Sequence, residues 1–147
     1  LERDDRMEKI NFKDLPSTDI PIDSTNLNLL QTNVENSING TSLFEGSANE
    51  DVTLSDNVTN YNYIEVTLER NGLFKIIKIN PSNAKFNGIF QFNASTSVIQ
   101  LTAASYTISQ NKITKSEESY INFNSNGSFS LSTNNNQIKI TKVVGYK

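Results

Sequence analysis

The chain contains neither cysteine nor histidine. Without cysteine it has no disulfide and no thiolate metal site. Without histidine it lacks the usual metal ligand and the usual general base near neutral pH, so neither a Ser-His-Asp nor a Cys-His nucleophile can be assembled. A zinc site would have to consist of carboxylates alone. We therefore expect no catalytic residues, no metal site and no cofactor, and we interpret the protein as a non-enzyme.

Long apolar runs and a strong positive charge are also missing. The formal net charge is −3, from 13 basic and 16 acidic residues spread along the chain. No basic stripe is present, which argues against nucleic-acid binding. No run approaches the roughly 20 apolar residues of a membrane span, and no charged-then-apolar leader marks a signal peptide. We expect a protein made in a bacterial cytoplasm, with neither nucleic acid nor a membrane as partner.

Residues 1–23 are predicted to form an extended arm. Residues 1–6, "LERDDR", are charged and carry no apolar pattern. We interpret Met7 as the natural start of the protein and the residues before it as vector-derived. Pro16 and Pro21 disfavour a helix in this segment and favour extended or turn backbone.

Residues 24–40, "STNLNLLQTNVENSING", predict one amphipathic helix. Ser24 or Thr25 can cap its start, and Asn39-Gly40 supplies a left-handed stop. Apolar side chains at spacings of three and four residues share one face: Leu27, Leu30, Val34 and Ile38. This stripe packs either on the chain's own β-domain or against copies of itself as a short coiled coil, and the sequence leaves both interpretations open.

From Thr41 onward the apolar pattern has a period of two. Strands are predicted in "TSLFEG", "DVTLSD", "YNYIEVTLER", "LFKIIKI", "GIFQFNA", "TSVIQLTAASYTIS", "SYINFN", "SFSLS" and "QIKITKVVGY". Asn71-Gly72 and Asn126-Gly127 are hairpin signals, and Asn111 is a further turn residue. About nine or ten short strands with frequent turns predict a mainly β head, residues 41–147, as an antiparallel, jelly-roll-like β-sandwich.

Three parts of the chain resemble small tail and baseplate proteins of phages and prophages of low-GC Gram-positive bacteria. The resemblance is carried by "INFKDLPSTDIPIDSTNLNLLQTNVENSI" near the start, by "SLFEGS" and "VTLSDNVTNYNYIEV" in the middle, and by "QIKITKVVGYK" at the end. It implies a virion structural protein that is not an enzyme. It also implies a homotrimeric fibre, baseplate or receptor-binding component that attaches to other tail proteins and contacts host cell-wall saccharide. The helix of residues 24–40 would then be the oligomerisation stalk.

Saccharide binding requires flat aromatic faces beside hydrogen-bonding groups. Four tyrosines in or beside predicted strands qualify by residue type: Tyr61, Tyr63, Tyr106 and Tyr120. The competing interpretation is that they pack in the core or across strands, as strand tyrosines usually do. The absence of tryptophan also weakens the case for a lectin.

Two groups of acidic residues have the side chains for further sites. Asp51, Asp56 and Asn57 supply oxygen ligands of the kind that calcium takes, but such residues more often form turns. Glu117 and Glu118 have the chemistry of a glycosidase pair, yet neighbours in a strand point to opposite faces. A polysaccharide-cleaving tail enzyme is therefore disfavoured, and a monomeric carbohydrate-binding β-sandwich module remains the alternative to the virion component.

Overall fold

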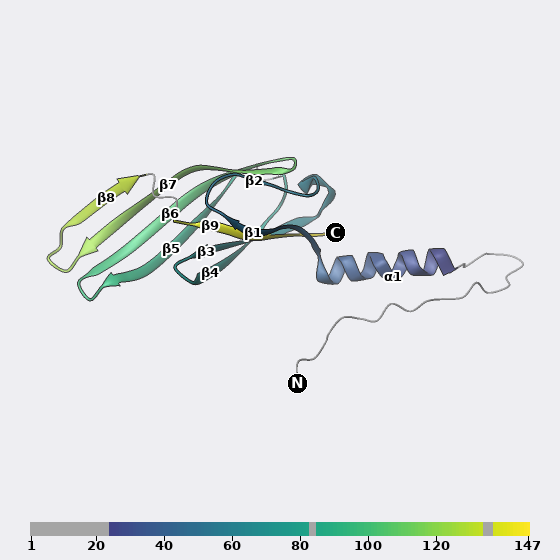
Figure 1. Ribbon diagram of the computed structural model, residues 1–147, viewed down its shortest axis with the longest axis horizontal. Helices are drawn as coiled ribbons and strands as arrows, with labels where there is room; N and C mark the ends of the chain where they lie inside the picture. The colour runs from purple at the N-terminus through teal and green to yellow at the C-terminus, as the bar shows by residue number, and fades with distance from the viewer. Residues whose placement is uncertain (1–23, 83–84, 134–136) are drawn as a thin grey trace, which may run out of the picture. The chain divides into compact units, whose positions relative to one another are not determined.

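The computed structural model describes residues 24–82, 85–133 and 137–147 (Figure 1). The predicted arm of residues 1–23 lies outside the described residues, and so do residues 134–136 between the predicted strands "SFSLS" and "QIKITKVVGY". The chain divides into two units, a helical one that ends at Thr41 and a β-unit that begins at Ser42.

Helix α1 spans Ser24–Asn39 and confirms the predicted helix. It ends where Gly40 adopts a φ of 71°, the left-handed conformation that glycine reaches without strain. The Gln31 side chain donates a hydrogen bond to Glu35 Oε1 at 3.2 Å, one turn further on. No helix among the described residues, α1 included, is long and apolar enough to cross a membrane.

In the described part of the chain, nine strands follow α1. Their bounds are β1 (Thr41–Ala48), β2 (Val52–Thr53), β3 (Tyr63–Arg70), β4 (Leu73–Ile79), β5 (Lys85–Ser95), β6 (Val98–Ser109), β7 (Lys112–Asn124), β8 (Phe129–Thr133) and β9 (Lys139–Tyr146). A 3₁₀ turn, η1 (Val58–Asn60), precedes β3.

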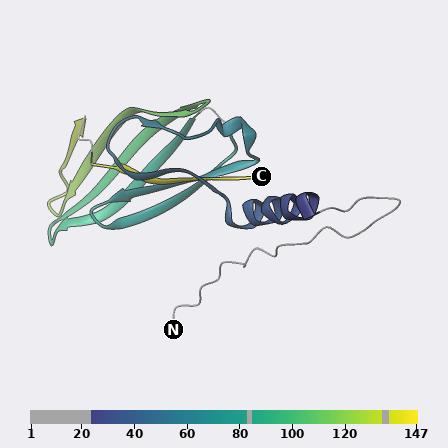
Figure 2. The same cartoon turned by 45° about the vertical axis from the view of Figure 1, so that its right-hand side comes forward.

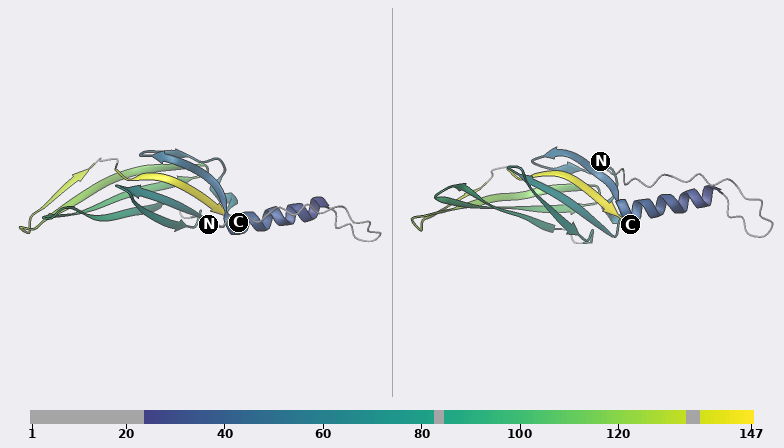
Figure 3. Two further views of the ribbon diagram at one scale, coloured as in Figure 1. Left: turned by 60° about the horizontal axis from the view of Figure 1, so that its bottom comes forward. Right: turned by 90° about the horizontal axis from the view of Figure 1, so that it is seen from below.

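The strands form two antiparallel sheets and confirm the mainly β prediction. The four-stranded sheet has the order β1-β9-β3-β4, so the last strand lies between the first and the third (Figure 3). The second sheet has the order β2-β7-β6-β5, with β8 paired to β7. Its long strands β5, β6 and β7 are joined by successive hairpins and run side by side (Figure 2).

Two of the predicted turns have the geometry that their sequence demands. Arg70 pairs with Leu73 across a two-residue hairpin, whose central residues Asn71 and Gly72 have φ values of 51° and 78°. Such a pair of positive φ values is the reason that Asn-Gly dominates these turns. Gly127, in the second Asn-Gly signal, has a φ of 80°.

Several strands differ in length from their predicted stretches, and for two of them, β2 and β7, the structure shows the cause. The "DVTLSD" strand is only the two residues of β2, because Leu54 N–H donates to the Asn111 carbonyl and Ser55 N–H donates to the Leu43 carbonyl, which takes the chain off the ladder. Strand β7 begins at Lys112, well before the predicted "SYINFN". A bulge at Ser116 interrupts its pairing with β6 and hides the period-two pattern in the sequence.

The core lies between the inner faces of the two sheets. The Phe86 and Tyr106 rings stack with centroids 4.8 Å apart on neighbouring strands of the larger sheet. Leu68, from the smaller sheet, fills the space above Gly88, where an added Cβ would lie 2.2 Å from Leu68 Cδ1. A side chain at position 88 would therefore force the Leu68 side chain to move.

Candidate functional site

The predicted oligomerisation stripe on α1 is largely exposed. Leu30 and Ile38 are 60% and 64% exposed, and Val34 is also exposed, while Leu27 is partly buried. Leu29, outside the stripe, is exposed as well. These side chains are available for self-association, and the oligomer stays a prediction.

The four tyrosines proposed as ligand contacts do not gather in one place. Tyr61 is buried beside Gly145, and its hydroxyl donates to Asp56 Oδ2 at 3.0 Å. Tyr63 is half-buried under the Lys78 ammonium, which lies 3.5 Å from the ring centroid. Tyr106 is fully buried in the core, where desolvation above all raises the pKa of its hydroxyl. Tyr120 is half-buried on β7, opposite Thr102. Packing accounts for the positions of Tyr61 and Tyr106, and a ligand role for these residues stays a prediction.

The oxygen-rich group at residues 51–57 forms turn and ion-pair contacts. Asp51 pairs with the Lys112 ammonium at 2.6 Å, and this contact lowers the pKa of Asp51. Asp56 accepts the backbone N–H of Asn57 at 2.7 Å, and this bond, followed by that from the Tyr61 hydroxyl, lowers the pKa of Asp56. The stabilisation from these bonds is present near neutral pH and is lost as the pH falls through the lowered pKa. Among the described residues, no cluster of three or more acidic side chains is placed to hold a metal ion.

Glu117 and Glu118 lie on opposite faces of β7, which confirms the geometric expectation. Glu117 is exposed, whereas Glu118 is only 2% exposed. The Glu118 carboxylate accepts a hydrogen bond from Lys115 Nζ at 2.7 Å and another from the Gln137 backbone N–H at 2.8 Å. The Ser116 bulge determines which glutamate is inside, because an unbroken alternation from Ile113 and Lys115 would point Glu117 inward.

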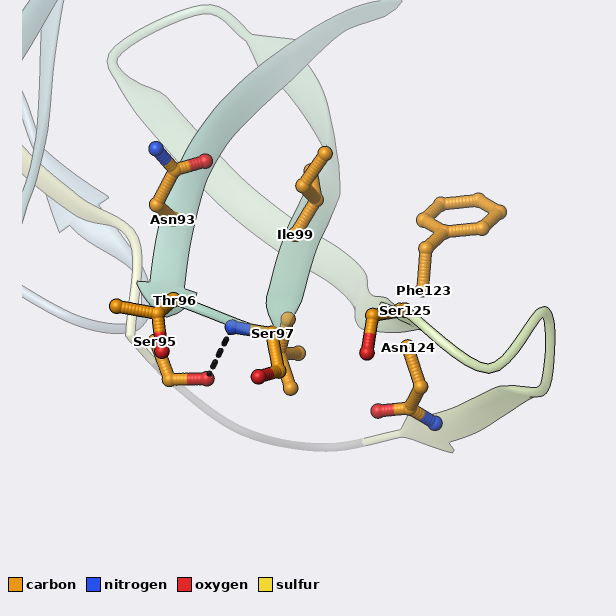
Figure 4. Close-up of a pocket in the computed structure, with 9 residues that line it drawn as sticks. Asn93, Ser95, Thr96, Ser97, Ile99, Phe123, Asn124 and Ser125 are labelled. Atoms are coloured by element: carbon orange, nitrogen blue, oxygen red, sulfur yellow. Dashed lines mark hydrogen bonds between the residues drawn. The ribbon is translucent and has the colours of Figure 1, made fainter.

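A pocket of about 330 Å³ lies where the β5–β6 turn meets the β7–β8 turn (Figure 4). The two turns are joined by a hydrogen bond from the Ser125 N–H to the Ser97 carbonyl at 2.9 Å. The pocket is lined by uncharged residues alone: Asn93, Ser95, Thr96, Ser97, Val98, Ile99, Phe123, Asn124 and Ser125. A charged ligand would find no opposite charge in this lining.

Strand register brings the main groups of this pocket together. Asn93, Ile99 and Phe123 are direct neighbours on β5, β6 and β7, and Figure 4 shows the three side chains on adjacent strands. The Phe123 ring is 47% exposed. A flat apolar ring beside amide and hydroxyl groups is the combination that binds the face and the hydroxyls of a neutral sugar.

Next to the pocket lies the solvent-facing side of strands β5, β6, β7 and β8, which we call the outer apolar face. Three cross-strand rows make up this face: Asn93–Ile99–Phe123–Phe129, Gln91–Leu101–Ile121–Leu131 and Ile89–Ala103–Ser119–Thr133. None of these side chains is charged. Phe129 is 72% exposed, and Leu131, Ile89 and Ile99 are exposed as well. Exposed apolar patches of this kind mark interaction surfaces more often than inert surface.

Neither the pocket nor the outer apolar face was anticipated from the sequence. The sequence does contain a pattern that marks such a face, because three strands each carry two apolar residues on one side. These pairs are Ile99 and Leu101, Ile121 and Phe123, and Phe129 and Leu131. The pattern alone does not show whether such a pair faces the core or the solvent. Only the register shows that Thr102, Ala104 and Tyr106 face the core on β6 instead.

Fold and surface together define a class of protein: a two-sheet antiparallel β-unit with an uncharged pocket and exposed apolar residues on one outer face, preceded by an amphipathic helix that also has exposed apolar residues. No protein-family model matches the chain, and no curated protein or solved structure matches it either. The resemblance to phage tail and baseplate proteins stays a prediction.

Proposed function

We propose that the protein is a non-enzymatic phage or prophage tail or baseplate component that forms a homotrimer through α1 and contacts host cell-wall saccharide through its β-unit. The observation that carries the proposal is the exposed stripe of Leu30, Val34 and Ile38 on α1. Burying such a side chain stabilises an assembly by about 1.5–3 kcal/mol relative to leaving it in water. A threefold closed assembly of helices would cover this stripe and place three heads at one end of a fibre.

The stalk is tested by the mass of the protein in solution. The unchanged chain is expected to sediment at three times the mass of one chain at micromolar concentration. Replacing Leu30 and Val34 together with aspartate should give folded monomers, because two charges on the stripe oppose association. The matched control carries Asn28→Asp and Thr32→Asp, with the same added charge and spacing on the polar face, and should remain trimeric. A monomeric unchanged protein rules out the stalk.

The contact surface is tested by binding to purified neutral host cell-wall polysaccharide. Replacing Phe123 with alanine removes the ring at the pocket and is expected to weaken binding by about tenfold, equivalent to about 1.4 kcal/mol. Phe74→Ala is the control, since Phe74 is another exposed ring, on β4 in the other sheet. Isothermal titration calorimetry of both variants measures the difference. If the two variants bind the polysaccharide equally well, the ligand does not contact this pocket.

The alternative function is a monomeric carbohydrate-binding module, and the uncharged pocket is the observation that favours it. The two tests separate the candidates. Binding that depends on Phe123 in a protein that is monomeric identifies the module, whereas binding in a trimer supports the virion component.

A further inference from the structure

Arg70, the last residue of β3, lies buried between the two sheets. The side chain is 1% exposed, and its guanidinium lies 4.3 Å from the centre of the Phe92 ring. Its Nη2 donates to the side-chain oxygens of Gln100 and Gln137. Its Nε and Nη1 are buried and have no hydrogen-bond partner among the described residues. Burial lowers the pKa of Arg70, while the electrostatic influence of Glu118 and Tyr120 acts in the opposite direction.

The Glu118 carboxylate, whose charge acts on Arg70, is engaged by other groups. Glu118 already accepts a hydrogen bond from Lys115 Nζ at 2.7 Å and the backbone N–H groups of Gln137 and Ile138. Two buried cations therefore share one buried carboxylate, which leaves one positive charge in excess. Within the described residues, Arg70 makes no salt bridge. A buried charge left in this state is strongly destabilising.

A second unpartnered donor faces the same part of the interior. The Thr102 hydroxyl is buried and has no hydrogen-bond partner in the described structure. Thr102 is on the inner face of β6, two residues from Gln100, whose side chain contacts Arg70. It stands opposite Tyr120, which is close enough to Arg70 to act on it electrostatically. The groups that lack partners here are an excess cation and a hydroxyl, and both can donate to one negative acceptor.

We propose that a small inorganic monoanion of chloride or bromide size binds inside the β-sandwich, against Nε and Nη1 of Arg70, with the Thr102 hydroxyl as a further donor. Such an ion supplies the missing negative charge and accepts all three hydrogen bonds. A water molecule would satisfy the donors but would leave the charge in excess. The site is separate from the surface pocket and from α1, so it does not depend on the proposed function.

The experiment measures thermal unfolding of the full chain at constant ionic strength, with chloride replacing the bulky anion gluconate. Raising chloride from about 1 to about 100 mM is expected to raise the unfolding midpoint, by about 3–6 °C per tenfold once the site is mostly filled. Bromide should act in the same way. Equal midpoints in chloride and gluconate over the whole range overturn the proposal and leave water as the occupant.

Variants assign the effect to this site. Arg70→Gln should abolish the chloride dependence, and a dependence that survives this change contradicts the assignment. Thr102→Val keeps the shape and removes one donor, so a chloride concentration several-fold higher should be needed for the same rise, even if Arg70→Gln fails to fold. Thr67→Val, on the same strand as Arg70, is the matched control and should keep the full response. A Thr102→Val protein with an unchanged chloride response also contradicts the site.

Discussion

Replacing Glu118 with alanine is expected to lower the free energy of unfolding by about 3–5 kcal/mol. The change leaves Lys115, whose side chain is almost fully buried, without the carboxylate that it pairs with. It also removes the acceptor for the backbone N–H groups of Gln137 and Ile138, where the chain enters β9. Unpaired buried donors and an unpaired buried charge act in the same direction. Chemical denaturation followed by circular dichroism measures the loss.

Two further variants show whether the loss comes from burial. Glu117→Ala removes the same type of side chain from the exposed face of β7 and should change stability by no more than about 0.5 kcal/mol. Glu118→Gln keeps an acceptor oxygen but loses the negative charge, so it should fall between the two alanine variants. If Glu118→Ala costs no more than Glu117→Ala, water reaches Lys115 and the cluster is not desolvated.

Replacing Gly145 with alanine is expected to destabilise the β-unit by about 1–3 kcal/mol through overpacking. The added methyl group would lie 2.5–2.7 Å from three atoms of the Tyr61 ring. The ring cannot simply turn away, because it is rigid and buried and its hydroxyl donates to Asp56. Glycine at position 145 therefore makes room for an aromatic ring. The measurement is again the unfolding free energy, compared with that of the unchanged protein.

A double mutant tests whether the Tyr61 ring causes the destabilisation by Gly145→Ala. With Tyr61 changed to leucine, a smaller and more flexible side chain, Gly145→Ala should lose most of its effect, which gives a coupling of about 1–2 kcal/mol between the two positions. Gly46→Ala is the control, since Gly46 is an exposed strand glycine whose nearest neighbour, Phe44 Cζ, lies 3.1 Å from the added carbon. An equal loss at positions 46 and 145 points to strand propensity instead of the ring.

Local signals in the sequence were sufficient for the elements that depend on local backbone chemistry. The apolar spacing and Gly40 located α1, because both act within a few residues. Asn71-Gly72 located the β3–β4 hairpin, because that dipeptide reaches positive φ at both positions. Period-two alternation then predicted Ile64, Val66 and Leu68 on one face, and all three are fully buried.

The features that depend on register were not predictable in this way. The Ser116 bulge changes which residues of β7 face inward, so the sequence did not reveal that Glu118 would be inside with Lys115. Arg70 ends the predicted strand "YNYIEVTLER", and only the tertiary fold places its side chain against Gln100 and Gln137. The pocket likewise needs the alignment of Asn93, Ile99 and Phe123 across three strands, which no local pattern encodes.

The position of β9 between β1 and β3 has a consequence for the order in which the chain folds. Strands β5 to β8 pair with their sequence neighbours, so they can associate early through short loops. The four-stranded sheet is different, because β1 cannot be joined to β3 until β9, Lys139–Tyr146, has arrived. During synthesis the emerging chain would hold β1 with an open edge until β9 has left the ribosome. Chains that stop before β9 would keep two unpaired strand edges and would be prone to aggregation.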